Sequence, residues 1–130
     1  MYMAYKDKGR YGSTRIHMDV ADALNLMVFA SNNGFAIWHI FRRQDAELLA
    51  QFMGERFKRN GNLILQQMIY LSDDDLAELW HTYRIRPYVI YQRAGDMVFI
   101  PAGCPHQVSL ITLIQDNFRY IYFILGQQSS

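Results

Sequence analysis

Short runs of hydrophobic residues at strand spacing make up most of this chain. Residues 23–30 are apolar except for Asn25, a pattern typical of a strand that is covered on both faces. The Asn-Gly pair at 33–34 signals a hairpin turn, and the alternation over 35–41 predicts the returning strand. Further strands are expected over residues 14–19, 88–93, 97–100, 107–114 and 118–125, the last followed by a polar tail.

Two segments have a helical period instead. From Gln44 onwards, hydrophobic residues recur at steps of three and four, which predicts a helix. Its predicted buried stripe is Leu48, Leu49, Phe52, Met53 and Phe57, and its basic end, Arg56, Lys58 and Arg59, is expected to be solvated. Ser72 is the predicted N-cap of a second helix, because three aspartates follow it at the positive end of the helix dipole. Its predicted stripe is Leu76, Leu79, Trp80 and Tyr83.

Many short strands separated by turns, with two helices outside them, predict a mainly β fold, either a barrel or a sandwich. The chain has 130 residues, of which 51% are hydrophobic, and this suits one globular domain. A formal net charge of +1 gives no electrostatic case for a nucleic-acid patch. The single Cys104 excludes an intramolecular disulfide framework and a multi-cysteine zinc site. Because no signal-peptide core or membrane-length apolar run is present, we expect a soluble intracellular protein.

The candidate chemistry begins with His17 and Asp19, which are one residue apart. On a strand, residues i and i+2 point to the same face, so the imidazole and the carboxylate would converge. Two histidines and one carboxylate form the triad that binds non-haem Fe(II) and leaves positions open for a cosubstrate and oxygen. His106 is the candidate second histidine, since a rigid corner over residues 101–105 delivers it to a predicted strand. The alternative is that these side chains merely pack, because H-x-D also occurs by chance.

Longer motifs accompany these residues. Residues 95–108 read Gly-Asp-Met-Val-Phe-Ile-Pro-Ala-Gly-Cys-Pro-His-Gln-Val, and residues 11–25 extend from Tyr-Gly-Ser-Thr through the H-x-D to Asn25. At these motifs the chain resembles the JmjC-domain oxygenases, in particular the branch that demethylates lysine 9 of the histone H3 tail. The resemblance continues through residues 38–42, 67–71 and 83–93, with a shortened middle loop.

The resemblance implies a double-stranded β-helix, the cupin-like jelly roll, with two accessory helices. It also implies Fe(II) held by His17, Asp19 and His106, 2-oxoglutarate as cosubstrate and dioxygen as oxidant. In this family, 2-oxoglutarate is converted to succinate while an N-methyl group of lysine is hydroxylated and lost as formaldehyde. The implied partner is a methylated histone tail, and the implied location is the nucleus.

The resemblance also suggests residues that bind the cosubstrate. Thr14 matches a threonine that hydrogen-bonds the far carboxylate of 2-oxoglutarate, and Asn25 matches a strand position that faces the same pocket. On a regular strand Thr14 would share a face with Ile16 and not with His17, so its role requires a local twist. Ala36 stands where many family members have a lysine.

The chain is expected to be a single partial JmjC domain over residues 1–130, truncated at its N-terminus and diverged after residue 108. Apolar residues at the truncated edges would then be exposed and open to a partner. Two alternatives to a demethylase remain. One is a catalytically inactive cupin remnant that serves as an interaction module, and the other is a hydroxylase of protein side chains.

Overall fold

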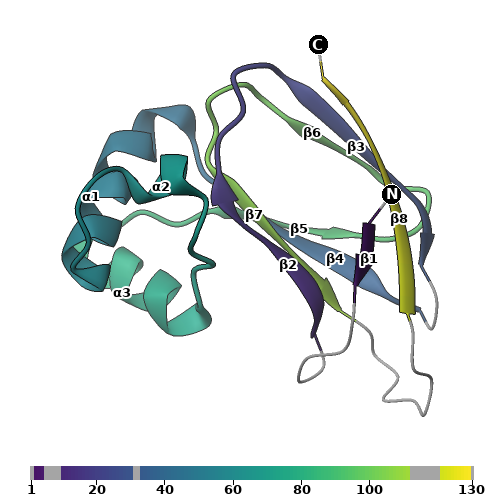
Figure 1. Ribbon diagram of the computed structural model, residues 1–130, viewed down its shortest axis with the longest axis horizontal. Helices are drawn as coiled ribbons and strands as arrows, with labels where there is room; N and C mark the ends of the chain where they lie inside the picture. The colour runs from purple at the N-terminus through teal and green to yellow at the C-terminus, as the bar shows by residue number, and fades with distance from the viewer. Residues whose placement is uncertain (1, 5–9, 31–32, 112–120, 130) are drawn as a thin grey trace.

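The computed structural model describes residues 2–4, 10–30, 33–111 and 121–129, which form two four-stranded antiparallel sheets and a helical block (Figure 1). The sheet orders are β1-β8-β3-β6 and β2-β7-β4-β5. The strands are β1 (Tyr2–Ala4), β2 (Arg10–His17), β3 (Ala23–Ala30), β4 (Phe35–Ile40), β5 (Tyr88–Gln92), β6 (Met97–Ile100), β7 (His106–Ile111) and β8 (Ile121–Ser129). Most sheet neighbours are distant in sequence, and the two sheets share one core, as expected for the predicted double-stranded β-helix.

The inward faces of the two sheets share one hydrophobic core. Its members from β3 and β6 are Ala23, Met27, Val98 and Ile100, and those from β4 and β7 are Ala36, Trp38, Ile40, Val108 and Leu110. In β7, His106 is in register with Ile40 and Val108 is in register with Trp38. Directly opposite residues on paired strands share a face, so His106 points to the interior of the sandwich.

The helical block lies between β4 and β5 in the chain and packs at one end of the sheets (Figure 1). It comprises the 3-10 turn η1 (Arg43–Asp45), α1 (Ala46–Phe57), α2 (Leu63–Gln66) and α3 (Asp73–Tyr83). A second core joins this block to β2 and to the residue that follows β4. Its members are Ile16, Phe41, Leu49, Phe52, Met53, Leu63, Ile64, Ile69, Leu71, Leu79 and Ile85. The sequence predicted α1 and α3 but not α2, a single turn whose N-cap is Asn62.

For two residues, the prediction that they belong to a buried helix stripe is wrong. Leu48 and Trp80 are exposed, because the helical block covers only one side of each helix. The Trp80 ring is instead covered by the guanidinium groups of Arg84 and Arg86, whose carbon atoms lie 5.3 and 4.5 Å from its centre. Cations over an aromatic face are stabilised by the ring quadrupole, which accounts for a half-exposed tryptophan at this surface.

The prediction that the last strand ends before a polar tail is also wrong. Strand β8 runs through Ser129, and Gln127 is in register with Asn25 of β3. Pairing along β3 therefore extends the strand past the hydrophobic residues that predicted it. Residues 112–114 and 118–120, which were predicted as strand, lie outside the described residues.

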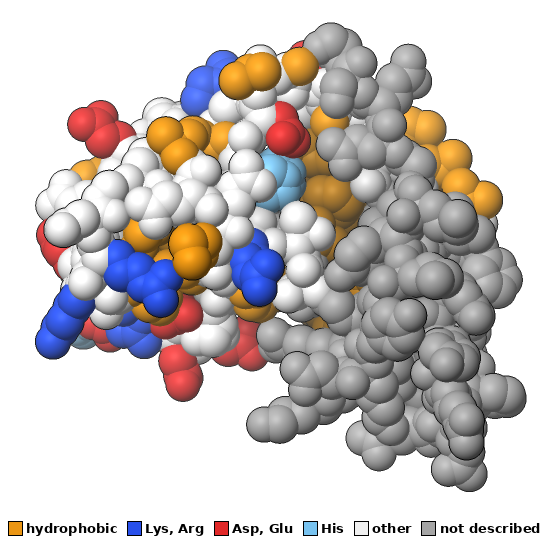
Figure 2. All heavy atoms as spheres, in the orientation of Figure 1, with side chains coloured by type: hydrophobic (Ala, Val, Ile, Leu, Met, Phe, Trp, Pro, Cys, Tyr) orange, Lys and Arg blue, Asp and Glu red, His pale blue; other side chains and the backbone are white. Residues whose placement is uncertain are grey.

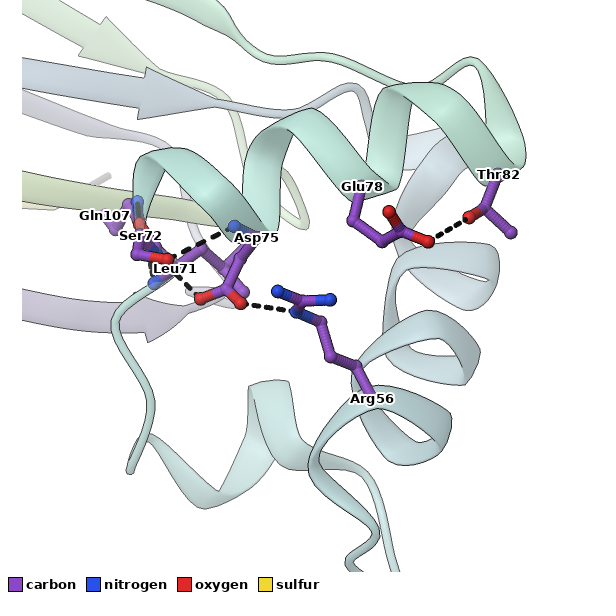
Figure 3. Close-up of polar contacts among 7 residues, drawn as sticks. All are labelled: Arg56, Leu71, Ser72, Asp75, Glu78, Thr82 and Gln107. Carbon is purple, nitrogen blue, oxygen red and sulfur yellow. Dashed lines mark hydrogen bonds and ion pairs between the residues drawn. The ribbon is translucent and has the colours of Figure 1, made fainter.

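The predicted cap of α3 is confirmed as a complete capping box. Ser72 Oγ accepts from the Asp75 backbone N–H at 3.1 Å, and the Asp75 carboxylate accepts from the Ser72 N–H at 2.8 Å (Figure 3). Arg56 of α1 donates to the other oxygen of the same carboxylate, so the prediction that Arg56 is only solvated is wrong. Burial alone would raise the pKa of Asp75, but the hydrogen bonds from Ser72 and Arg56 outweigh it and lower the pKa below 3.8.

Replacing Asp75 tests this link between α1 and α3. We expect Asp75→Ala to lower the free energy of unfolding by about 1–3 kcal/mol at pH 7. Because its folded-state pKa is depressed, Asp75 stabilises the fold above its unfolded-state pKa, and the stabilisation is lost as the pH falls through the folded-state pKa. Urea denaturation at pH 7 and pH 3 should therefore show a difference between wild type and variant that shrinks in acid.

Asp74→Ala is the matched control, since Asp74 is an exposed acid in the same first turn. It removes only a favourable interaction with the helix dipole and is expected to cost about 0.5 kcal/mol. Equal losses in the two variants would contradict the role given to the capping box and to Arg56.

Candidate metal centre

The structure brings His17, Asp19 and His106 together at one end of the paired strands β2 and β7. His17 ends β2, His106 begins β7, and the two residues are in register with ring centres 4.2 Å apart. Asp19 lies two residues beyond the end of β2, so the prediction that it is a strand residue is wrong. Its Oδ1 is 3.9 Å from His17 Nε2, and its Oδ2 is 3.6 Å from His106 Nε2.

Both imidazoles are oriented by the backbone two residues before them. Nδ1 of His17 lies 2.8 Å from the Arg15 carbonyl oxygen, and Nδ1 of His106 lies 2.9 Å from the Cys104 carbonyl oxygen. A carbonyl only accepts, so each Nδ1 donates its hydrogen and each Nε2 faces Asp19. Burial lowers the pKa of His106, outweighing the opposing effect of the Cys104 carbonyl, and this favours the neutral form that binds metals.

One oxygen of the Asp19 carboxylate, Oδ2, is buried and has no hydrogen-bond partner among the described residues. A buried, unpartnered carboxylate oxygen is costly, and a bound cation removes that cost. Two neutral imidazoles and one carboxylate form the donor set of non-haem Fe(II) sites, so the residues present fit this metal.

In Figure 2 a histidine side chain lies at the surface beside an acidic side chain, and hydrophobic side chains are visible next to it. Apolar surroundings with a few polar groups are typical of ligand sites.

A rigid corner, Pro101–Pro105, connects the loop that carries Asp19 to the strand that carries His106. The Gly103 N–H donates to the Asp19 carbonyl oxygen at 2.9 Å, and the Ala102 N–H donates to Asp22 Oδ1 at 2.7 Å. From the other side, Arg43 Nε donates to the Ala102 carbonyl oxygen at 2.8 Å. These three bonds hold the carboxylate ligand and the second histidine in a fixed relation.

Gly103 is required in this corner for two reasons. Its φ is +76°, and a Cβ there would lie 3.1 Å from Arg43 Nε. We expect Gly103→Ala to cost about 1–2 kcal/mol in stability and to weaken metal binding about tenfold. Gly95→Ala is the control, since Gly95 has a φ of +90° but an added Cβ would meet nothing within 4 Å. Titration with Co(II), followed by its visible absorption, should separate the two variants, and equal affinities would contradict the role of the corner.

Thr14 lies on the same face as the two histidines because β2 contains a bulge. Thr14 is in register with Val108 and His17 with His106, so three steps along β2 match two steps along β7. The extra residue turns Ile16 to the opposite side, where it is fully buried in the helical core and its N–H donates to the Ile69 carbonyl. The local irregularity that a role for Thr14 requires is therefore present, and the role itself stays a prediction.

Asn25 is buried between the sheets on β3. Its side-chain oxygen accepts a hydrogen bond from Gln92 Nε2 at 3.1 Å. Sequence reasoning missed Gln92, although a glutamine that shares the inward face of its strand with Ile90 was a usable signal. His39 is buried on the outer face beside Gln107 and is not part of the cluster, as its apolar neighbours suggest.

Comparison with known families agrees with this geometry. The model of the JmjC domain, described as a hydroxylase, matches residues 9–113. The chain belongs to the JmjC family. This JmjC chain is 28% identical to lysine-specific demethylase 3A of Rattus norvegicus and 30% identical to lysine-specific demethylase 3 of Drosophila melanogaster. Both alignments cover 83% of the JmjC chain. It is 39% identical to lysine-specific demethylase JMJ27 of Arabidopsis thaliana over 58% of its length.

These relatives are much longer proteins. The JmjC chain spans only 12%, 18% and 10% of their respective lengths. The first two alignments, over 152 and 155 residues, are longer than the 130-residue chain, so those relatives carry insertions that it lacks. In the described part of the chain, no helix has the length and apolar character needed to cross a membrane.

Proposed function

We propose that residues 1–130 act as a JmjC dioxygenase domain that depends on Fe(II) and 2-oxoglutarate and demethylates N-methyl-lysine in histone tails, in the nucleus. The observation that carries the proposal is the pair of backbone-oriented imidazoles facing a buried carboxylate oxygen that has no hydrogen-bond partner among the described residues. The relatives that are named lysine-specific demethylases support the substrate class. Lysine 9 of histone H3 is the proposed target.

In this proposal His17, Asp19 and His106 would hold the metal through two imidazole nitrogens and one carboxylate oxygen. Bound Fe(II) supplies the activation of dioxygen, coupled to oxidation of 2-oxoglutarate. Asn25 and Thr14 provide an amide N–H and a hydroxyl to the two carboxylates of the cosubstrate. The two backbone carbonyls accept from Nδ1 of each imidazole, which leaves Nε2 for the metal.

An anaerobic titration with Fe(II) and 2-oxoglutarate tests the proposal most directly. We expect a visible charge-transfer band that saturates near one equivalent of each and is absent from His106→Ala. No band from folded wild-type protein would overturn the proposal and favour an inactive remnant. If the band is observed, turnover on methylated histone H3 peptides should give succinate and formaldehyde together. A peptide that gains oxygen and keeps its methyl group would point to a side-chain hydroxylase instead.

One further observation favours an interaction role in addition to catalysis. On β3 and β6, Leu24 is in register with Phe99, and both are exposed together with Met97 and Val28. Leu24 and Phe99 lie on the outer face of their sheet, because the neighbouring Ala23, Val98 and Ile100 face the core. Contiguous exposed apolar side chains mark contact surfaces in many soluble proteins. Covering of this face by a partner is therefore the second candidate function.

A further inference from the structure

The side chain of Gln92 is completely buried and connects residues of the two sheets. Gln92 is the last residue of the edge strand β5 and has no exposed surface. Its Oε1 accepts from Trp38 Nε1 at 2.8 Å. Its Nε2 lies 3.0 Å from the Asn25 carbonyl oxygen, 3.1 Å from Asn25 Oδ1 and 3.1 Å from the Asp96 carbonyl oxygen. One amide therefore joins β4 in one sheet to β3 in the other sheet, and also to the turn between β5 and β6.

The orientation of the Gln92 and Asn25 amides follows from one donor, the indole N–H of Trp38. An indole N–H donates only, so the atom of Gln92 that faces Trp38 must be the carbonyl oxygen. The amino group of Gln92 then faces Asn25 and shares its two hydrogens among three acceptors, of which Asn25 Oδ1 is one. The amino group of Asn25 is consequently directed away from Gln92. A reversed Asn25 amide would place two donors against each other.

Trp38 also contacts the metal centre. Its ring is stacked on His106, with centroids 6.1 Å apart and an interplanar angle of 29°. Both side chains are 3% exposed, so neither has room to turn independently. The hydrogen bond to Gln92 holds the indole in the plane that backs the His106 ring.

We propose that Gln92 is a positioning residue that sets which end of the Asn25 amide is presented to an anionic ligand. The inference rests on the proposed function, in which Asn25 donates to a carboxylate of 2-oxoglutarate. Gln92 itself touches neither the cosubstrate nor the metal in this scheme. It acts through Asn25 on the cosubstrate and through Trp38 on the orientation of His106.

The test compares Gln92→Leu with Gln107→Leu. Gln107 is the matched control because it is also a fully buried glutamine, bonded to the Leu71 backbone on the outer face of β7 (Figure 3). Dissociation constants for Mn(II), and for 2-oxoglutarate with Mn(II) bound, are measured by calorimetry, and thermal unfolding reports stability. We expect both variants to lose stability, but only Gln92→Leu to bind 2-oxoglutarate about tenfold or more weakly. Its affinity for Mn(II) is expected to change by less than about threefold, because the bond of His106 Nδ1 to the Cys104 carbonyl still holds the His106 ring.

Trp38→Phe is the second variant and decides the question if Gln92→Leu does not fold. It keeps an aromatic ring against His106 and removes the donor that fixes the Gln92 amide, together with part of the ring volume. We expect a loss of 2-oxoglutarate affinity of about threefold or more. Unchanged 2-oxoglutarate affinity in the folded variants, or an equal loss in Gln107→Leu, would overturn the inference alone. Wild-type protein that binds Mn(II) but not 2-oxoglutarate would overturn the proposed function, and this inference with it.

Discussion

Asp19→Asn is expected to abolish tight Fe(II) binding and, at the same time, to make the metal-free protein more stable. The carboxylate lies between two imidazole Nε2 atoms, and its buried Oδ2 has no hydrogen-bond partner among the described residues. A neutral amide is cheaper to bury than this charge but is a poor ligand. We expect the affinity for Fe(II) to fall by about 100-fold or more. The free energy of unfolding, measured with a chelator present, is expected to rise by about 1 kcal/mol.

Asp96→Asn is the control for this pair of opposite effects. Asp96 is an exposed acid in the β5–β6 turn, where its carboxylate accepts from the Arg93 N–H. The same substitution there should leave Fe(II) affinity unchanged and should not stabilise the protein. If Asp19→Asn destabilised the metal-free protein, Asp19 would be part of the fold's own hydrogen-bonding network and not a site held in readiness for a cation.

The sequence predicted the parts of the fold that local patterns encode. Strands β3 and β6 have the predicted bounds, because an apolar run and tight turns define them locally. The N-cap at Ser72 was also readable, since a cap is formed within one turn. By contrast, the pairing of Gln127 with Asn25 depends on a strand about a hundred positions away, and no local signal marks a polar residue as part of a sheet.

The candidate site was predictable as a set of residue types but not as a geometry. His17, Asp19 and His106 were identified from spacing and motif, yet Asp19 comes after the strand and reaches the histidines from a turn. The bulge that brings Thr14 to the same face accompanies the burial of Ile16 in the helical core, a tertiary contact that no local pattern encodes. Gln92 matters only through Trp38 and Asn25, which lie 54 and 67 positions away in the chain. Such contacts have no periodicity to detect.

Asn25→Asp is expected to prevent binding of 2-oxoglutarate with little effect on the metal. Aspartate has the size of asparagine, and either of its oxygens still accepts the hydrogen bond from Gln92 Nε2. The group directed away from Gln92 would change from a donor to a second negative oxygen. A like charge placed against a carboxylate costs several kcal/mol, so we expect the dissociation constant of 2-oxoglutarate to rise by about 100-fold or more.

Two further variants separate charge repulsion from simple loss of a donor. Asn25→Leu removes the donor without adding charge and is expected to weaken 2-oxoglutarate binding only about tenfold. Asn62→Asp makes the same change at the N-cap of α2, where the side-chain oxygen accepts from the Ile64 and Leu65 N–H groups, and should not alter binding. Calorimetry with Mn(II) bound would measure all three constants. If Asn25→Asp bound 2-oxoglutarate no worse than Asn25→Leu, the anion would not lie against this amide, and Thr14 on the bulged strand would be the remaining predicted contact.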